Sequence, residues 1–279
     1  MVKQLTSERG APPGSLRYFA VLFAPPAARP VLDALYGFDA EVRATTDATA
    51  HEAAHARLQW WRGEIDRLVA GRPTHPIAIA LAPLRQRRDA DIASLHESLV
   101  AADLDLARLT YRNWDELDAY CYRASGALQT LAAATLAGER TATAAELEFA
   151  RQLGSAQRQA EMIRDFQHDL HRGRLYLPLE VIEAAGFDPS GWQLAPPQEP
   201  VTRLLDAWRA RVARSLESLP GLLPERSLRA AQRPGLVLAA LHERLLTETA
   251  RIQTDAGLRA DVGPLARLWT AWRTAVRYA

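Results

Sequence analysis

The chain has 279 residues, 48% of them hydrophobic and 24% charged, and a formal net charge of +1. This composition is typical of a globular protein with a large core and excludes a disordered or fibrous chain. The near balance of charges removes the electrostatic reason to expect nucleic acid as a partner. The single cysteine, Cys121, cannot form an internal disulfide, which favours a reducing compartment such as the cytoplasm. No apolar run approaches the roughly 18–20 residues of a membrane span, and we expect no secretory signal.

Apolar residues recur every three to four positions along most of the chain, which predicts a series of helices. In chain order these helices cover about 30–42, 47–70, 76–87, 91–101, 114–137, 142–172, 201–219, 233–254 and 262–277. A loop is expected from Gly186 to Pro200, where glycine and proline cluster. The sequence therefore predicts an all-α fold. We expect a single domain over residues 1–279, with the helices of 201–277 in the same bundle.

The sixth predicted helix carries two acids four residues apart. Asp165 and Asp169 project from one helical face, with about 5–6 Å between their Cβ atoms. Arginines stand nearby at positions 158, 164, 172 and 174. Two interpretations remain open at this point. Either a Mg²⁺ ion joins the carboxylates to a diphosphate held by guanidinium groups, or the arginines neutralise both acids on a solvated helix face.

Four segments, in order, share a pattern with a known family. They are Ala34-Leu35-Tyr36-x-Phe38, Leu58-x-Trp60-Trp61-Arg62 with Gly71 to Pro76, Tyr120-Cys121-Tyr122-Arg123-x-x-Gly126, and Leu153-Gly154-x-Ala156 with Ile163 to Pro178. They resemble the entry to the first aspartate motif, the second helix and its turn, the Tyr-Cys-Tyr segment and the second aspartate motif of the squalene/phytoene synthase family. The resemblance is clearest over residues 18–188.

This resemblance implies a fold, a reaction and a set of site residues. The fold would be an all-α bundle of the isoprenoid synthase type around a central cavity. The reaction would join two prenyl diphosphates head to head, with Mg²⁺ neutralising the departing diphosphate and a dry apolar tunnel sheltering the cation. Carried over by motif, the catalytic residues are Asp165, Asp169 and Tyr176, the diphosphate-binding residues are Arg164, Arg174 and Tyr120, and both aspartates are Mg²⁺ ligands.

The first aspartate motif departs from the family pattern. Between Asp39 and Asp47, Arg43 and Ala44 replace the two adjacent aspartates of that pattern. Two like charges 4 Å apart cost about 4 kcal/mol at an effective dielectric near 20, so a cation at position 43 opposes a metal ion there. Glu41 and Asp47 are the candidate substitute Mg²⁺ ligands, and we expect metal-dependent ionisation to be impaired.

Three further replacements point the same way. The family's Gln and Asn before the second motif align with Arg158 and Glu161, and a small residue aligns with Gln129. A buried Gln without partners is costly, so the cavity is either more polar there or filled. Two functions stay open: a Mg²⁺-dependent head-to-head prenyltransferase, or a non-catalytic relative that binds a lipid-like ligand or a protein partner, as the family's respiratory complex I assembly factors do.

Two other patterns suggest a metal and a membrane. His51-Glu52-Ala-Ala-His55 matches the zinc hydrolase pattern, but its polar flanks and missing third ligand disfavour catalytic zinc. Near the C-terminus, Trp269 and Trp272 lie among arginines in a basic, aromatic, amphipathic helix. Such a helix is typical of peripheral contact with a membrane, which would suit a lipid substrate, and equally of an ordinary docked terminal helix.

Overall fold

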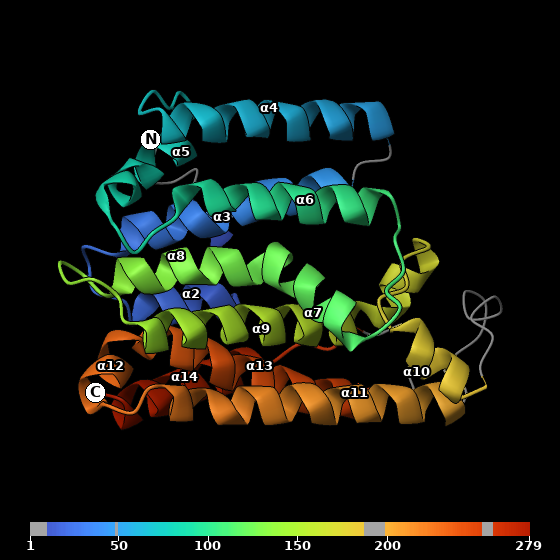
Figure 1. The fold of residues 1–279 in the computed structure, drawn as a ribbon. Helices are drawn as coiled ribbons and strands as arrows, with labels where there is room; N and C mark the ends of the chain where they lie inside the picture. The colour runs from blue at the N-terminus through green and yellow to red at the C-terminus, as the bar shows by residue number, and fades with distance from the viewer. Residues whose placement is uncertain (1–9, 48–49, 187–198, 253–258) are drawn as a thin grey trace.

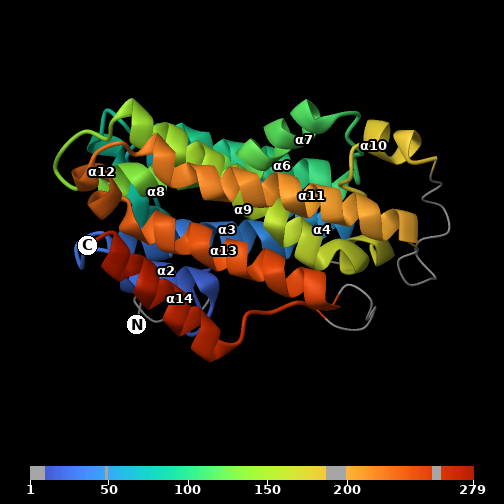
Figure 2. The same cartoon turned by 90° about the horizontal axis from the view of Figure 1, so that it is seen from below.

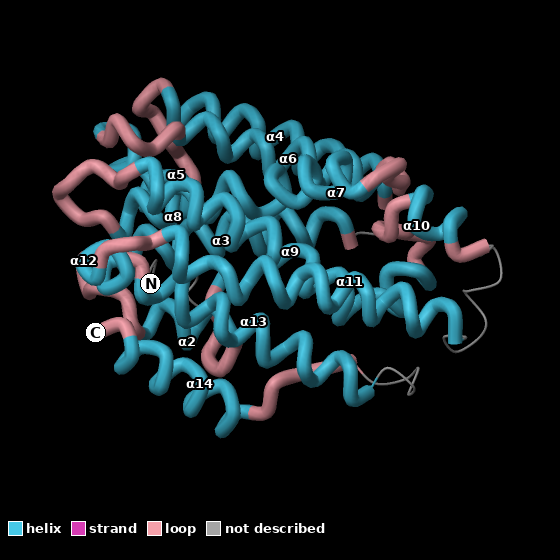
Figure 3. Tube along the Cα trace, turned by 60° about the horizontal axis from the view of Figure 1, so that its bottom comes forward, coloured by secondary structure: helices cyan, strands magenta, loops and turns pink. Residues whose placement is uncertain are grey.

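The helices that the apolar periodicity predicts are present in a computed structural model, which describes residues 10–47, 50–186, 199–252 and 259–279 (Figure 1). The α-helices are α2 (Leu16–Leu22), α3 (Arg29–Thr46), α4 (His51–Val69), α5 (Pro76–Leu81), α6 (Leu95–Leu106), α7 (Trp114–Cys121), α8 (Ala127–Leu136), α9 (Ala144–His171), α10 (Leu179–Ala184), α11 (Glu199–Ser218), α12 (Arg226–Ala231), α13 (Arg233–Ile252) and α14 (Pro264–Arg277). No strand occurs in these described ranges (Figure 3), and the all-α prediction is confirmed.

The structure differs from the predicted boundaries at a few places. The helix expected over 76–87 ends at Leu81 and continues as a 3₁₀ turn, because Pro83 lacks the N–H that a further helical turn needs. The short helices α2, α10 and α12 are too brief to show a clear apolar period and were not predicted. Most of the loop expected from 186 to 200 lies outside the described residues.

The long helix α9 runs through the middle of the bundle. In Figure 1, α4, α6 and α3 lie on one side of α9, and α11, α13 and α14 lie on the other; the turned view of Figure 2 shows α14 at the outer edge. One apolar cluster joins α3, α4, α5, α6 and α8, and a second joins α7, α9, α11 and α13. Because α9 touches helices of both clusters, its side chains face the interior on several sides.

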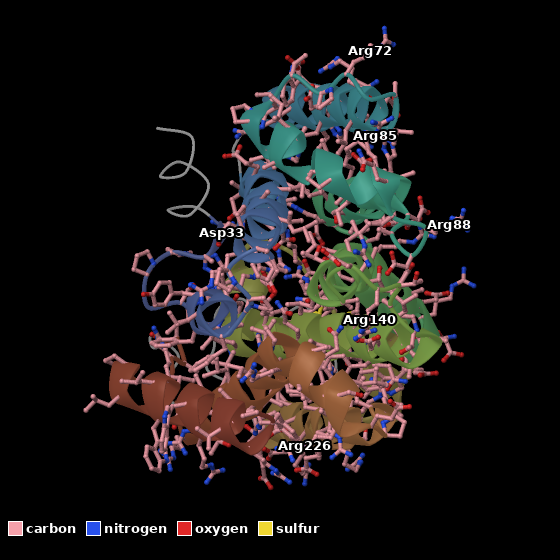
Figure 4. The ribbon with its side chains drawn as sticks, turned by 90° about the vertical axis from the view of Figure 1, so that its left-hand side faces the viewer. Asp33, Arg72, Arg85, Arg88, Arg140 and Arg226 are labelled. Carbon is pink, nitrogen blue, oxygen red and sulfur yellow. The ribbon has the colours of Figure 1, made fainter. Side chains whose placement is uncertain are left out.

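Buried polar contacts fix the start of α9. Thr143 and Glu146 form a capping box. Glu146 also accepts hydrogen bonds from Arg140 at 2.5 Å and from Gln232, which lies between α12 and α13, at 2.8 Å. Burial alone would raise the pKa of Glu146, but these donors lower it to about 2. Figure 4 shows Arg140 at the end of the bundle that faces the viewer. The register of α9, and with it the placement of its two aspartates, is therefore anchored at this end.

A π-helical turn at Tyr122–Gly126 interrupts the helix predicted over 114–137. Here α9 passes very close: a Cβ atom added to Gly154 would lie 2.6 Å from the Cα atom of Gly126. Both positions therefore require glycine for the backbones to approach. Such turns occur often at functional sites, and this one directly follows the end of α7, which carries Tyr120.

Candidate functional site

A cavity of about 500 Å³ lies between the second half of α9, the end of α3, α6 and the segment before α14. Its lining residues are Arg43, Thr46, Asp47, Asp105, Arg158, Arg164, Asp165, Gln167, His168, Asp169, His171, Arg174 and Arg259. Five arginines and four aspartates thus face one space. Guanidinium groups bind phosphate oxygens through paired hydrogen bonds, so this lining suits an anionic ligand.

Asp165 lines the cavity but is already held by two guanidinium groups. Arg164 donates to its carboxylate at 2.8 and 2.6 Å, and Arg259 donates at 2.6 and 2.8 Å. Burial would raise the pKa of Asp165, but the two arginines outweigh it and hold that pKa below its usual value. The side chain is therefore an ionised partner of arginines.

Asp169 has a different environment one helical turn along. Among the described residues, no side chain forms a hydrogen bond or an ion pair with it, and its backbone oxygen instead accepts from the Arg174 N–H at 2.8 Å. Burial is the main cause that raises the pKa of Asp169 to about 6, with Asp165 adding to the rise. Arg158 and Arg174 lower the pKa of Asp169 but do not offset the effect of burial, so this carboxylate is only partly compensated near neutral pH.

At the first motif, Arg43 takes part in a buried ion-pair network. Its guanidinium lies 2.8 Å from a carboxylate oxygen of Asp39 and donates to Glu161 at 2.6 Å. Burial would raise the pKa of Glu161, but Arg43 in particular holds it well below the usual range. The positive charge at position 43 therefore points into the bundle and is balanced there by α3 and α9 side chains.

A second cluster joins the predicted tyrosines to Asp105. Tyr120 and Tyr176 each donate a hydrogen bond to Asp105 Oδ1 at 2.8 Å, and Arg158 donates to Tyr120 Oη at 2.8 Å. Burial raises the pKa of both phenols, so they stay protonated donors. Arg158 also lies 3.8 Å from a carboxylate oxygen of Glu161, which links this cluster to the Arg43 network.

The other predicted site residues divide into two groups. Arg174 lines the cavity and donates to the Thr46 carbonyl at 2.6 Å. Asp47 also lines it but is paired with Arg172. Glu41 is not among the lining residues; it pairs with Arg57 of α4. The structure thus brings Asp47 together with Asp165 and Asp169 around one cavity but turns Glu41 toward another helix.

The apolar interior beside the first half of α9 is closely packed. Between α2, α3, α8, α9 and α13 the void measures about 10 Å³, and Leu32, Phe149 and Leu153 are among its walls. A void of this size is at the lower limit of the roughly 10–15 Å³ that a single water molecule needs. Gln129 is buried in this wall, and its amide donates a hydrogen bond to Gln157 at 3.0 Å. The sequence left open whether the cavity at this position is more polar or filled, and in the structure it is filled, with the amide hydrogen-bonded.

These residues do not fit the two-motif magnesium centre that the resemblance implies. The described ranges contain no group of three or more His, Cys, Asp or Glu side chains that could hold a metal ion. Asp165 is paired with two arginines, and Arg43 lines the cavity where the family pattern has aspartate. Mg²⁺ usually takes one or two carboxylates together with substrate phosphates and water. Within the described ranges Asp169 is a free carboxylate of that kind, and magnesium dependence stays a prediction.

The zinc pattern lies elsewhere. His51, Glu52 and His55 are exposed in the first turns of α4, and His55 Nδ1 is 3.9 Å from a carboxylate oxygen of Asp103. They belong to no described group that could hold a metal ion. Their placement agrees with a polar helix start at the surface.

Sequence reasoning missed Asp105 and Arg259, which make charged contacts in the cavity. Asp105 accepts from both tyrosines, and Arg259 reaches Asp165 from 94 positions along the chain. Neither lies in a motif, and periodicity says nothing about contacts between distant segments. Arg158 and Glu161 stood out only as departures from the family pattern, which was a usable signal.

Comparison with known proteins bears on the whole chain. The family model of squalene/phytoene synthases matches residues 13–269. A 15-cis-phytoene synthase of Synechocystis sp. is 29% identical over 180 residues, which are 61% of this chain and 53% of that protein. A chloroplastic phytoene synthase of Narcissus pseudonarcissus is 28% identical over 206 residues, 72% of this chain and 47% of the relative. The match therefore spans about half the length of these relatives.

Solved structures show the same fold. A dehydrosqualene synthase crystallised with a ligand superposes with a TM-score of 0.81 at 17% identity, covering 99% of this chain and 95% of that one. The squalene synthase HpnC of Alicyclobacillus acidocaldarius gives 0.73 at 20% identity, covering 90% and 92%. The expected isoprenoid synthase fold is confirmed. With the family model matching most of its length, this chain belongs to the squalene/phytoene synthase family.

Proposed function

We propose that the chain binds a prenyl diphosphate with the diphosphate group in the arginine-lined cavity, and that it does so without magnesium. The observation that carries this proposal is the lining itself, in which five guanidinium groups and four carboxylates face one space of about 500 Å³. Relatives of the family act on prenyl diphosphates, and arginine pairs well with phosphate oxygens. Side chains then supply the positive charge that metal ions supply in a two-motif site.

In this proposal the chain does not join two prenyl groups at an enzymatic rate. Charge on a departing diphosphate is stabilised most strongly by bound metal ions, and Arg43 with its partners opposes their binding at the first motif. The apolar void beside the first half of α9 measures about 10 Å³, which is too small for a prenyl chain. On these grounds we propose binding of the diphosphate without turnover.

One observation favours the second candidate, a magnesium-dependent head-to-head prenyltransferase. Asp169 is half-buried, lacks a hydrogen-bonded side-chain partner among the described residues and has a pKa raised to about 6. A cation bound there would remove an unfavourable charge. Incubation with farnesyl or geranylgeranyl diphosphate decides between the candidates: a magnesium-dependent hydrocarbon product with release of pyrophosphate would establish the transferase.

Calorimetric titration with farnesyl thiodiphosphate, a poorly ionising analogue, tests the binding proposal. The full chain is titrated in EDTA and again in Mg²⁺. We expect binding in EDTA, and we expect Arg174→Gln to weaken it by tenfold or more, since a hydrogen bond to a charged group contributes about 1.5–3 kcal/mol. Arg72→Gln is the matched control, because Arg72 is exposed and projects from the opposite end of the bundle (Figure 4).

Two results would overturn the proposal. The first is an absence of heat in EDTA with binding restored by Mg²⁺, which would mean that a metal ion is part of the site. The second is an equal loss of affinity in Arg174→Gln and Arg72→Gln, which would mean that the ligand responds to net charge alone.

A further inference from the structure

The C-terminal helix α14 presents its apolar side chains to solvent. The exposed residues are Leu265, Leu268, Trp269, Trp272 and Val276, whose exposed fractions run from 48% for Trp272 to 81% for Leu265. At about 100° per residue, these five positions fall within about 100° of the helix circumference. They form one continuous apolar stripe on the outside of the molecule.

A different face of α14 holds the helix on the bundle. Ala271 and Ala275 are buried and belong to a small cluster with Phe19, Val237 and Leu241. A surface helix of a globular protein normally turns its large apolar residues toward the core. Here two alanines make the internal contact while the leucines and tryptophans face outward, so packing within the chain does not account for the stripe.

The charges of α14 have one sign. Its sequence contains three arginines and no Asp or Glu. Arg273 and Arg277 are exposed and follow the stripe around the helix, and the rings of Trp269 and Trp272 lie 5.3 Å apart. Exposed tryptophan and leucine flanked by arginine are typical of helices that lie in the interface of an anionic membrane.

We propose that α14 docks the protein on the surface of an anionic lipid bilayer, with the apolar stripe in the headgroup region and Arg273 and Arg277 on lipid phosphates. Figure 2 shows α14 along the edge of the bundle, where a flat surface can reach it. None of the described helices combines the length and hydropathy that crossing a bilayer requires. The contact is therefore with one leaflet. α14 itself carries no acid, while Glu217 of α11 and Glu243 of α13 line the hollow beside Trp269 and Arg273. The single sign of charge on α14 favours a negatively charged surface over a second copy of this chain.

Flotation of the full chain with vesicles tests the proposal. Vesicles of phosphatidylcholine alone are compared with vesicles of equal parts phosphatidylcholine and phosphatidylglycerol. We expect binding to the anionic vesicles, a loss of more than about tenfold in the double variant Trp269→Ser/Trp272→Ser, and about fivefold less binding for each arginine removed in Arg273→Gln/Arg277→Gln. Trp60→Ser is the matched control, because Trp60 is 46% exposed on α4, and α4 lies across the bundle from α14 (Figure 1).

Several outcomes would overturn the proposal. One is a failure of the natural chain to float with anionic vesicles. Another is a loss of binding in Trp60→Ser as large as the loss in Trp269→Ser/Trp272→Ser. A third is that the natural chain is a dimer in analytical ultracentrifugation and does not bind vesicles, while Trp269→Ser/Trp272→Ser is a monomer. This result would show that the stripe contacts a second copy of the chain. Circular dichroism establishes that the variants are folded, and the arginine variant tests the same surface without touching an apolar side chain.

Discussion

The buried pair between Arg43 and Glu161 can be tested by removing its acid. Glu161→Ala deletes the carboxylate that Arg43 reaches at 2.6 Å and that Arg158 approaches at 3.8 Å. Removing one partner of a buried ion pair costs about 3–5 kcal/mol, because the other charge stays buried without compensation. Arg43 retains Asp39 at 2.8 Å and Arg158 retains Asp105 at 3.7 Å. The loss is therefore expected near the lower end, at about 3 kcal/mol.

Urea unfolding followed by far-ultraviolet circular dichroism, at pH 7 with EDTA, measures this loss. Glu161→Gln keeps the size of the side chain and one acceptor, so it should cost about half as much. Glu148→Ala, which removes a solvent-accessible pair with Arg151 on the same helix, is the control and should cost less than about 1 kcal/mol. A loss in Glu161→Ala no larger than in Glu148→Ala would refute the view that this network balances the charge at position 43.

Two more predictions concern α9. Burial raises the pKa of Asp169 from 3.8 to about 6, so the folded state loses stability as pH rises through that window, and the loss of about 3 kcal/mol is complete above pH 6. Asp169→Asn should therefore be more stable than the natural chain at pH 7, by up to about 3 kcal/mol. The two proteins should be equally stable near pH 4. Urea titrations that give the same stability difference at both pH values would contradict this prediction. Gly154→Ala would bring a Cβ within 2.6 Å of Gly126 and should destabilise the chain by about 2 kcal/mol or more, whereas Gly221→Ala, with nothing within 4 Å, should be nearly neutral in the same assay.

The limits of the sequence-based predictions follow from the range of the interactions involved. Apolar periodicity located the long helices because it depends on neighbours three and four residues away. It could not locate the π-helical turn at Tyr122–Gly126, which depends on the close approach of another helix. The family pattern identified Arg43 as a cation at a position where the family has aspartate. It could not identify the partner of Arg43, Glu161, which is 118 positions away in the sequence. The filling of the interior by Gln129 was one of two stated outcomes, and only the three-dimensional packing decided between them.

The retained second motif does not by itself require a metal ion. Asp165 is bound by Arg164 of its own helix and by Arg259 from the segment that precedes α14, each through two hydrogen bonds. In this arrangement the carboxylate ties a distant segment to α9 and has a structural role without any cation. A vacant metal ligand would behave differently, since removing an uncompensated acid stabilises a metal-free protein.

Asp165→Ala therefore distinguishes the two roles of this residue. We expect the variant to be less stable than the natural chain by about 1–2 kcal/mol in EDTA, a value below the usual range for charged hydrogen bonds because Arg259 is 66% exposed. Asp47→Ala, whose pair with Arg172 is exposed, should change the free energy of unfolding by less than about 0.5 kcal/mol. Asp165 would instead be a metal ligand if two results occurred together. Asp165→Ala would be at least as stable as the natural chain in EDTA, and Mg²⁺ would stabilise the natural chain but not the variant. The loss expected here instead follows from a guanidinium group occupying the place of the ion.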